Sequence, residues 1–82
     1  MHLNIITPDT KIFEGEVDST TFPGAKGSFQ VLKNHAPIIS ALEKGDIKYK
    51  ASAEQETTIT ISGGVVEVLN NQITVLVDSV IA

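Results

Sequence analysis

The sequence contains no cysteine, no arginine and no tryptophan, and its net charge is not positive. Without cysteine, a disulfide framework and thiolate chemistry are both excluded. The formal net charge is −4, and positive charge comes only from six scattered lysines: Lys11, Lys26, Lys33, Lys44, Lys48 and Lys50. Nucleic-acid-binding domains carry a clustered basic face. We therefore expect no nucleic-acid partner.

Long apolar runs are also missing. No stretch approaches the roughly 20 consecutive apolar residues that a membrane-spanning helix requires. The first residues, Met1–Ile5, have neither the basic start nor the apolar stretch of a signal peptide. We expect a chain without direct membrane insertion that stays where it is made, unless a targeting segment has already been removed.

The length predicts one domain over residues 1–82. A domain of this size buries only about 60% of the surface that its unfolded chain exposes. Its stability margin is therefore thin, and a partner protein would add to it.

Alternation of apolar and polar residues dominates the chain, and no stretch of helical length holds a helical period. We predict strands over residues 3–7, 11–13, 16–22, 28–32, 38–42, 47–51, 57–62, 66–68, 72–78 and 80–81. Segment 38–42 fits a strand or one helical turn, and its β-branched residues favour the strand. Turn signals fall between the strands, and the spacing is typical of a sandwich or barrel. The sequence thus predicts an all-β fold, an antiparallel β-sandwich of about ten strands in two sheets.

Several turns can be placed in more detail. Gly45 is expected to adopt a positive φ in a turn over 43–46. Asn70 and Asn71 separate two β runs, which suits a tight hairpin with positive φ at both central residues. The segment 24–28 has the residue types of a phosphate-binding loop in the wrong order and spacing, so we interpret it as a turn.

Catalytic chemistry has little support in the sequence. A nucleophile needs a base within hydrogen-bond reach and a third group that orients the base. His2 and His35 are the only histidines, and His2 is expected on a frayed terminus. Ser28 and Ser40 are near His35 in sequence, but neither has the context of a nucleophile elbow. We predict no catalytic residues, and a small histidine-dependent or metal-dependent enzyme is the least favoured hypothesis.

Three acidic residues, Glu14, Glu16 and Asp18, alternate and would share one face of a strand. Such a face could bind a cation, or it could be a solvated surface that discourages edge-to-edge pairing. We favour the second interpretation, because no histidine is expected nearby to complete a transition-metal site. No metal and no cofactor are predicted.

Residues 27–42 are the most informative segment. Pro37 favours extended geometry at the residue before it, and Asn34 and His35 both tolerate the positive φ of a sharp turn. We expect Lys33, Asn34 and His35 to project from the sheet at a loop tip. A polar tip on a rigid scaffold can form a contact site, and a plain surface turn would give the same pattern.

Motifs along the chain are similar to those of the epsilon subunit of F-type ATP synthases, which is called delta in mitochondria. They are Ile6-Thr7-Pro8, Phe13, Gly15-Glu16-Val17, Gly27, Val31-Leu32, His35-Ala36-Pro37, Gly45, Gly63-Gly64, Glu67-Val68 and Thr74-Val75-Leu76. The resemblance covers residues 3–81. It depends on the order and spacing of the motifs together.

The resemblance implies a ten-stranded sandwich of two five-stranded sheets that acts as a non-catalytic rotor subunit of the central stalk. It would dock on the gamma subunit and on the polar loops of the c-ring, and act on the catalytic alpha/beta head indirectly. The implied c-ring contacts are Ser28, Phe29, Lys33, Asn34 and His35. The implied gamma contacts are Ile38, Ser40, Leu42 and Val80. The implied location is peripheral, at the cytoplasmic face of a bacterial inner membrane.

Most bacterial and plastid members continue into a helical hairpin that can hold back ATP hydrolysis, and this sequence ends at Ala82 before it. The chain as given is therefore expected not to act as an extendable brake. The alternative hypothesis is an unrelated small β-sandwich module that binds protein or glycan. Such a module would display an exposed aromatic platform, for which only Phe13, Phe22, Phe29 and Tyr49 are available.

Overall fold

A computed structural model describes residues 1–51 and 55–81. In these residues the chain forms ten strands and no helix, which confirms the predicted fold class. The strands are β1 (His2–Ile6), β2 (Lys11–Glu16), β3 (Ser19–Gly24), β4 (Gly27–Leu32), β5 (Ile38–Leu42), β6 (Gly45–Lys50), β7 (Thr57–Ile61), β8 (Gly64–Leu69), β9 (Gln72–Val77) and β10 (Val80–Ile81).

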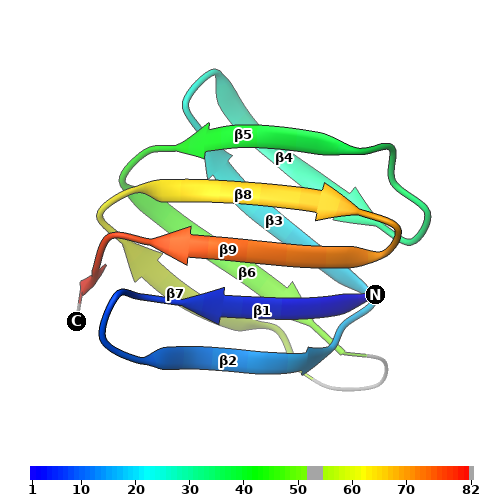
Figure 1. The fold of residues 1–82 in the computed structure, drawn as a ribbon, viewed down its shortest axis with the longest axis horizontal. Helices are drawn as coiled ribbons and strands as arrows, with labels where there is room; N and C mark the ends of the chain where they lie inside the picture. Colours follow the sequence, from blue (N-terminus) through cyan, green and yellow to red (C-terminus); the bar gives the residue numbers. More distant parts are fainter. Residues whose placement is uncertain (52–54, 82) are drawn as a thin grey trace.

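The strands form two layers (Figure 1). The front sheet has the order β5-β8-β9-β1-β2, and the back sheet has the order β10-β7-β6-β3-β4. The two sheets are joined at one corner, where Gly24 of β3 pairs with Leu42 of β5. Around this corner the Glu43 amide donates to the Pro23 carbonyl at 2.9 Å, and the Ala25 amide donates to the Ala41 carbonyl at 3.0 Å.

One pairing differs from the expected antiparallel arrangement. β1 lies parallel to β9, with His2 opposite Gln72 and Ile6 opposite Leu76. The other pairings are antiparallel. The parallel pair brings the first strand against the ninth, so the start of the chain closes the front sheet.

The core lies between the sheets and is built by strand alternation. Because successive side chains point to opposite faces, every second residue of a strand enters the interior. The apolar side chains with no exposed surface are Leu3, Ile5, Phe22, Val31, Ile47, Ile61, Val66 and Val75. Two aromatic pairs extend this core: Phe13 lies on Tyr49, with ring centroids 4.4 Å apart, and Phe22 on Phe29 at 5.6 Å.

Two local predictions need correction, and one is confirmed. The expected strand over 16–22 is interrupted, since β2 ends at Glu16 and β3 begins at Ser19. Gly45 begins β6 and has no positive φ, because the turn after β5 needs only Glu43 and Lys44. The hairpin between β8 and β9 is as predicted, with φ of 52° at Asn70 and 60° at Asn71.

Candidate docking surfaces

The outer face of the front sheet carries most of the exposed large apolar side chains. Ile39 on β5, Val65 and Leu69 on β8, and Leu76 on β9 are 75%, 42%, 47% and 53% exposed. Val65 is directly opposite Leu76, and Ile39 is opposite Glu67 on β8. These positions alternate with the buried ones, so they share the side of the sheet that faces away from the core. We call Ile39, Val65, Leu69 and Leu76 the apolar face.

The outer face of the back sheet is polar. On β6, Lys48 and Lys50 are exposed, and they alternate with the buried Ile47 and Tyr49. Lys48 pairs with Thr58 of β7 and with Thr21 of β3. The two outer faces therefore differ in chemistry, since the front one carries four exposed large apolar side chains and the back one carries Leu32 on β4.

The residues expected to contact gamma do not lie on the apolar face. Leu42 is buried, and Ile38 and Ser40 are half-buried at the inward positions of β5, opposite the buried Val68 and Val66 of β8. Val80 is exposed, but it belongs to β10 at the edge of the back sheet. The structure therefore does not bring these four side chains together on one surface.

The sequence reasoning missed the apolar face itself. On β9, Leu76 lies between Val75 and Val77, and on β8, Val65 precedes Val66, so apolar residues occupy both sides of each strand. The available signal was that β8 and β9 carry apolar residues on both sides, although only one side of their sheet is buried. Ile39 lies within the expected 38–42 segment, but on the opposite side from the residues selected there.

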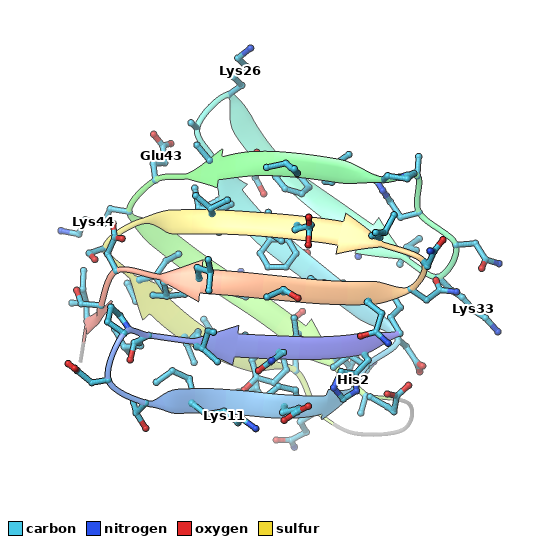
Figure 2. The ribbon with its side chains drawn as sticks, viewed as in Figure 1. His2, Lys11, Lys26, Lys33, Glu43 and Lys44 are labelled. Carbon is cyan, nitrogen blue, oxygen red and sulfur yellow. The ribbon has the colours of Figure 1, made fainter. Side chains whose placement is uncertain are left out.

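The residues expected to contact the c-ring form two separate groups. Ser28 and Phe29 lie near the start of β4, close to the turn at Ala25 and Lys26, while Lys33, Asn34 and His35 follow its end. A six-residue strand of about 3.3 Å per residue lies between these ends. Figure 2 accordingly shows Lys26 and Lys33 projecting from different ends of the molecule.

Within the first group, Phe29 is half-buried and packs on the core residue Phe22, so its ring belongs to the interior. The second group does form a loop tip, as predicted. Asn34 has a φ of 66°, whereas His35 has no positive φ. The tip is held by the His35 amide, which donates to the Leu32 carbonyl at 3.1 Å.

The loop tip lies against the hairpin between β8 and β9. The Asn34 amide donates to Oδ1 of Asn71 at 2.7 Å, and Nδ2 of Asn71 donates to Oδ1 of Asn34 at 3.0 Å. His35 donates from Nδ1 to the Ala36 carbonyl at 2.7 Å. A shallow polar groove runs between the two loops and is lined by Asn34, His35, Pro37, Asn70 and Asn71.

The acidic strand face has a different structure from the one expected. His2 lies in β1, so it is not on a frayed terminus, and its ring points between two acidic side chains of β2 (Figure 2). Nε2 lies 2.8 Å from Glu14 and Nδ1 lies 2.9 Å from Glu16. The expectation that no histidine lies near these acids is therefore wrong. Asp18 is in the bend after β2, so it does not share their strand.

The contact between His2 and the two glutamates accompanies shifts in the pKa values of His2 and Glu14. Hydrogen bonds to Glu14 and then Glu16 raise the pKa of His2 above its ordinary value. The pKa of Glu14 is lowered by its hydrogen bond to Lys11 and then by its hydrogen bond to His2. In residues 1–51 and 55–81 no group of three or more His, Asp or Glu side chains is arranged to hold a metal ion.

A family model for the ATP synthase Delta/Epsilon chain beta-sandwich domain matches residues 1–82. The chain belongs to this family. A protein named ATP synthase epsilon chain from Chlorobaculum tepidum is 42% identical over 78 residues, which are 95% of this chain and 89% of that protein. The ATP synthase epsilon chain of Nitratidesulfovibrio vulgaris strain Miyazaki F is 43% identical over 79 residues, and the match covers 96% of this chain and 58% of the relative.

Two solved assemblies contain chains of the same fold. One is the mitochondrial ATP synthase of Euglena gracilis, with a TM-score of 0.89, 21% identity and coverage of 96% of this chain and 51% of the other. The second is the central stalk and c-ring of the mitochondrial ATP synthase of Tetrahymena thermophila. The match has a TM-score of 0.81 and 18% identity, and it covers 98% of this chain and 64% of the other. At these identities the likeness shows that the delta/epsilon sandwich is shared.

The delta/epsilon sandwich accounts for the aromatic residues of the chain as core. Phe22 and Tyr49 are buried, and each packs on a second ring, Phe29 and Phe13 respectively. The four aromatic side chains are thus paired in the interior, and the exposed platform expected of a glycan-binding module is missing from the part of the chain that the structure describes. The residues that the structure describes include no helix long and apolar enough to cross a membrane.

Proposed function

We propose that the chain is a non-catalytic subunit of the central stalk of an F-type ATP synthase, which docks on gamma and on the c-ring and turns with them. The proposal is carried by the 42% identity with an ATP synthase epsilon chain across 95% of this sequence. Its role would be mechanical, coupling rotation of the ring to the catalytic alpha/beta head. The chain would lie peripherally at the cytoplasmic face of a bacterial inner membrane and would need no cofactor.

The apolar face is the proposed gamma contact. A contiguous set of exposed apolar side chains on a small soluble protein marks a protein interaction surface. Ile39, Val65 and Leu76 come from three adjacent strands of one rigid sheet, so they need little reordering on binding. Interfaces of this kind combine an apolar centre with polar groups, and Glu67, opposite Ile39 and Thr74, is the charged residue within this face.

The loop tip of Lys33, Asn34 and His35 is the proposed c-ring contact. It joins β4 to β5 and is polar and exposed, apart from the half-buried His35. Ser28 and Phe29 lie at the other end of β4 and so would not reach the same surface. A polar loop tip fits polar loops of a ring, and the Lys33 ammonium would select acidic or carbonyl groups there.

The test is a binding measurement on two partners. The chain, purified with gamma, is bound to an immobilised c-ring in detergent, and binding to gamma alone is measured separately. Lys33→Glu is expected to weaken ring binding about tenfold and to leave gamma binding unchanged, since a reversed rim charge becomes repulsive.

Lys48→Glu is the matched control, because Lys48 is also exposed but lies on the polar outer face of the back sheet. It should leave ring binding within twofold of the unaltered chain. Equal effects of the two charge reversals would contradict the loop assignment. Failure of the unaltered chain to bind either gamma or the ring would contradict the proposed function as a whole.

A further inference from the structure

The β4–β5 loop is fixed to a part of the chain far from it in sequence. The two hydrogen bonds between Asn34 and Asn71 join residues 37 positions apart. In the described part of the chain they are the only hydrogen bonds that join residues 33–37 to a segment other than the strand just before them. The remaining bonds of the loop, made by His35, are local and do not set its position relative to the sandwich.

Asn71 is itself anchored on its other side. Its carbonyl accepts the His2 amide of β1 at 2.9 Å, and its backbone is held at a φ of 60° in the β8–β9 hairpin. The side chain is half-buried, whereas that of the neighbouring Asn70 is exposed. Asn71 thus connects the loop tip to the central strands of the front sheet.

The contact uses both ends of the Asn71 carboxamide. Oδ1 accepts the Asn34 amide while Nδ2 donates to Oδ1 of Asn34, and only a side chain with both an acceptor and a donor does this. Aspartate would keep the acceptor and lose the donor, and glycine would lose both. Glycine nevertheless tolerates the positive φ at this position, so it removes the side chain without straining the hairpin.

We propose that Asn71 is a positioning residue, which holds the Lys33–His35 tip in the shape that docks on the polar loops of the c-ring. The inference rests on the proposed function and adds a residue that does not itself need to touch the ring. A free loop must lose conformational entropy when it docks, and a loop already fixed loses less. Asn71 therefore strengthens docking by ordering the loop beforehand.

The first experiment measures the order of the loop in the full chain without any partner. Amide hydrogen exchange at Asn34 is followed by NMR in the unaltered chain, in Asn71→Gly and in Asn70→Gly. Asn70 is the matched control, since its φ of 52° is similar. We expect Asn71→Gly to speed exchange at Asn34 about five- to tenfold, the effect of losing its hydrogen-bond acceptor, and Asn70→Gly to leave it within twofold. Equal rates in the two variants would overturn the inference.

The second experiment measures binding of the same variants, in complex with gamma, to the immobilised c-ring. Asn71→Gly should weaken binding about five- to tenfold, and Asn70→Gly should not. Equal ring binding by Asn71→Gly and Asn70→Gly would overturn the inference.

Lys33→Glu separates the two possible failures. If Lys33→Glu weakens ring binding but Asn71→Gly does not, the loop docks without needing Asn71 and the positioning role is overturned. If neither variant changes ring binding, the loop is not the ring contact, and the docking assignment is overturned together with the inference that depends on it. Urea unfolding of Asn71→Gly and Asn70→Gly, both expected to remain folded, excludes loss of fold as the cause.

Discussion

At the scale of single residues, His2 is the group whose charge matters most to the edge of the front sheet. Both ring nitrogens face carboxylates of β2, at 2.8 Å and 2.9 Å. An imidazole can donate from both nitrogens only when it is protonated. The contact therefore stabilises the charged ring, which is why the pKa of His2 is raised.

The pH dependence of stability follows from the sign of these shifts. A group with a raised pKa in the folded chain adds stability below its unfolded pKa of about 6.5, and this contribution is lost as the pH rises through the folded pKa. The lowered pKa of Glu14 has the opposite effect: its contribution is present above its ordinary value and is lost as the pH falls through the folded pKa. The β1–β2 contact should therefore be strongest at pH values between the ordinary pKa of Glu14 and the unfolded pKa of His2.

We predict that His2→Gln lowers the urea midpoint at pH 5.5 and has little effect at pH 9. The reason is that the raised pKa keeps the unaltered ring charged at pH 5.5, and this charge is lost as the pH rises through the folded pKa. His35→Gln is the control, because the His35 ring contacts a backbone carbonyl and no carboxylate. A pH-independent effect of His2→Gln would show that the ring acts by packing alone. NMR titration of His2 in Glu14→Gln should give a lower pKa than in the unaltered chain, since Glu14 is the largest cause of the shift.

At the scale of elements, the positions of most strands could be predicted because the alternation of side chains is a local property. The break between β2 and β3 at Val17 and Asp18 could not be predicted, because neither residue is a glycine or a proline. The chain turns there because the Val17 amide donates to the Met1 carbonyl and the Asp18 amide to the Lys50 carbonyl. The parallel pairing of β1 with β9 was also beyond local pattern, because it joins residues at opposite ends of the chain.

The candidate site was predicted less completely than the fold. The loop tip could be placed, because Pro37 and Asn34 restrict the backbone locally. Its partner Asn71 could not be predicted, because the contact between Asn34 and Asn71 joins two different loops. The outward side of β5 was assigned wrongly because Ile38 and Ile39 are equally apolar. Only the pairing of β5 with β8 decides which of the two faces the core.

The start of β8 provides a prediction at this scale. Gly64 pairs with Val77 of β9 and with Leu42 of β5. A Cβ at this position would lie 2.2 Å from the Leu76 carbonyl oxygen, which belongs to the backbone and cannot move aside as a side chain would. We predict that Gly64→Ala lowers the free energy of unfolding by about 2–3 kcal/mol, the range of an overpacked core position, as measured by urea unfolding.

Gly15→Ala is the control for this prediction. Its added Cβ would be 3.1 Å from Cζ of Phe13, the far end of a side chain that can shift slightly. We expect a loss of less than about 1 kcal/mol for this variant. A Gly64→Ala chain as stable as the control would show that the β8–β9 pairing can open at Gly64 without cost.

At the scale of the whole molecule, the sandwich has two unlike outer faces. The front sheet carries the apolar face, and the outer face of the back sheet presents threonine and lysine side chains around β6, with Leu32 on β4. The same two-layer fold therefore fixes which side can dock by apolar contact. The loop tip and the β8–β9 hairpin lie at one end of both sheets, so a partner on the front sheet and a partner at this end can be bound together (Figure 1).

This arrangement leads to a prediction that separates the apolar face from the rest of the surface. Leu76→Lys places a charge within the apolar face, where gamma binding would remove it from water. Burying an unpaired charge is costly, so gamma binding should fall at least tenfold, a change of about 1.4 kcal/mol. Since Leu76 is 53% exposed in the free chain, the urea midpoint should change little.

Thr58→Lys adds the same side chain to the exposed outer face of the back sheet, and it should leave gamma binding unaltered. If Thr58→Lys weakens gamma binding and Leu76→Lys does not, gamma docks on the back sheet, and the apolar face must have another partner.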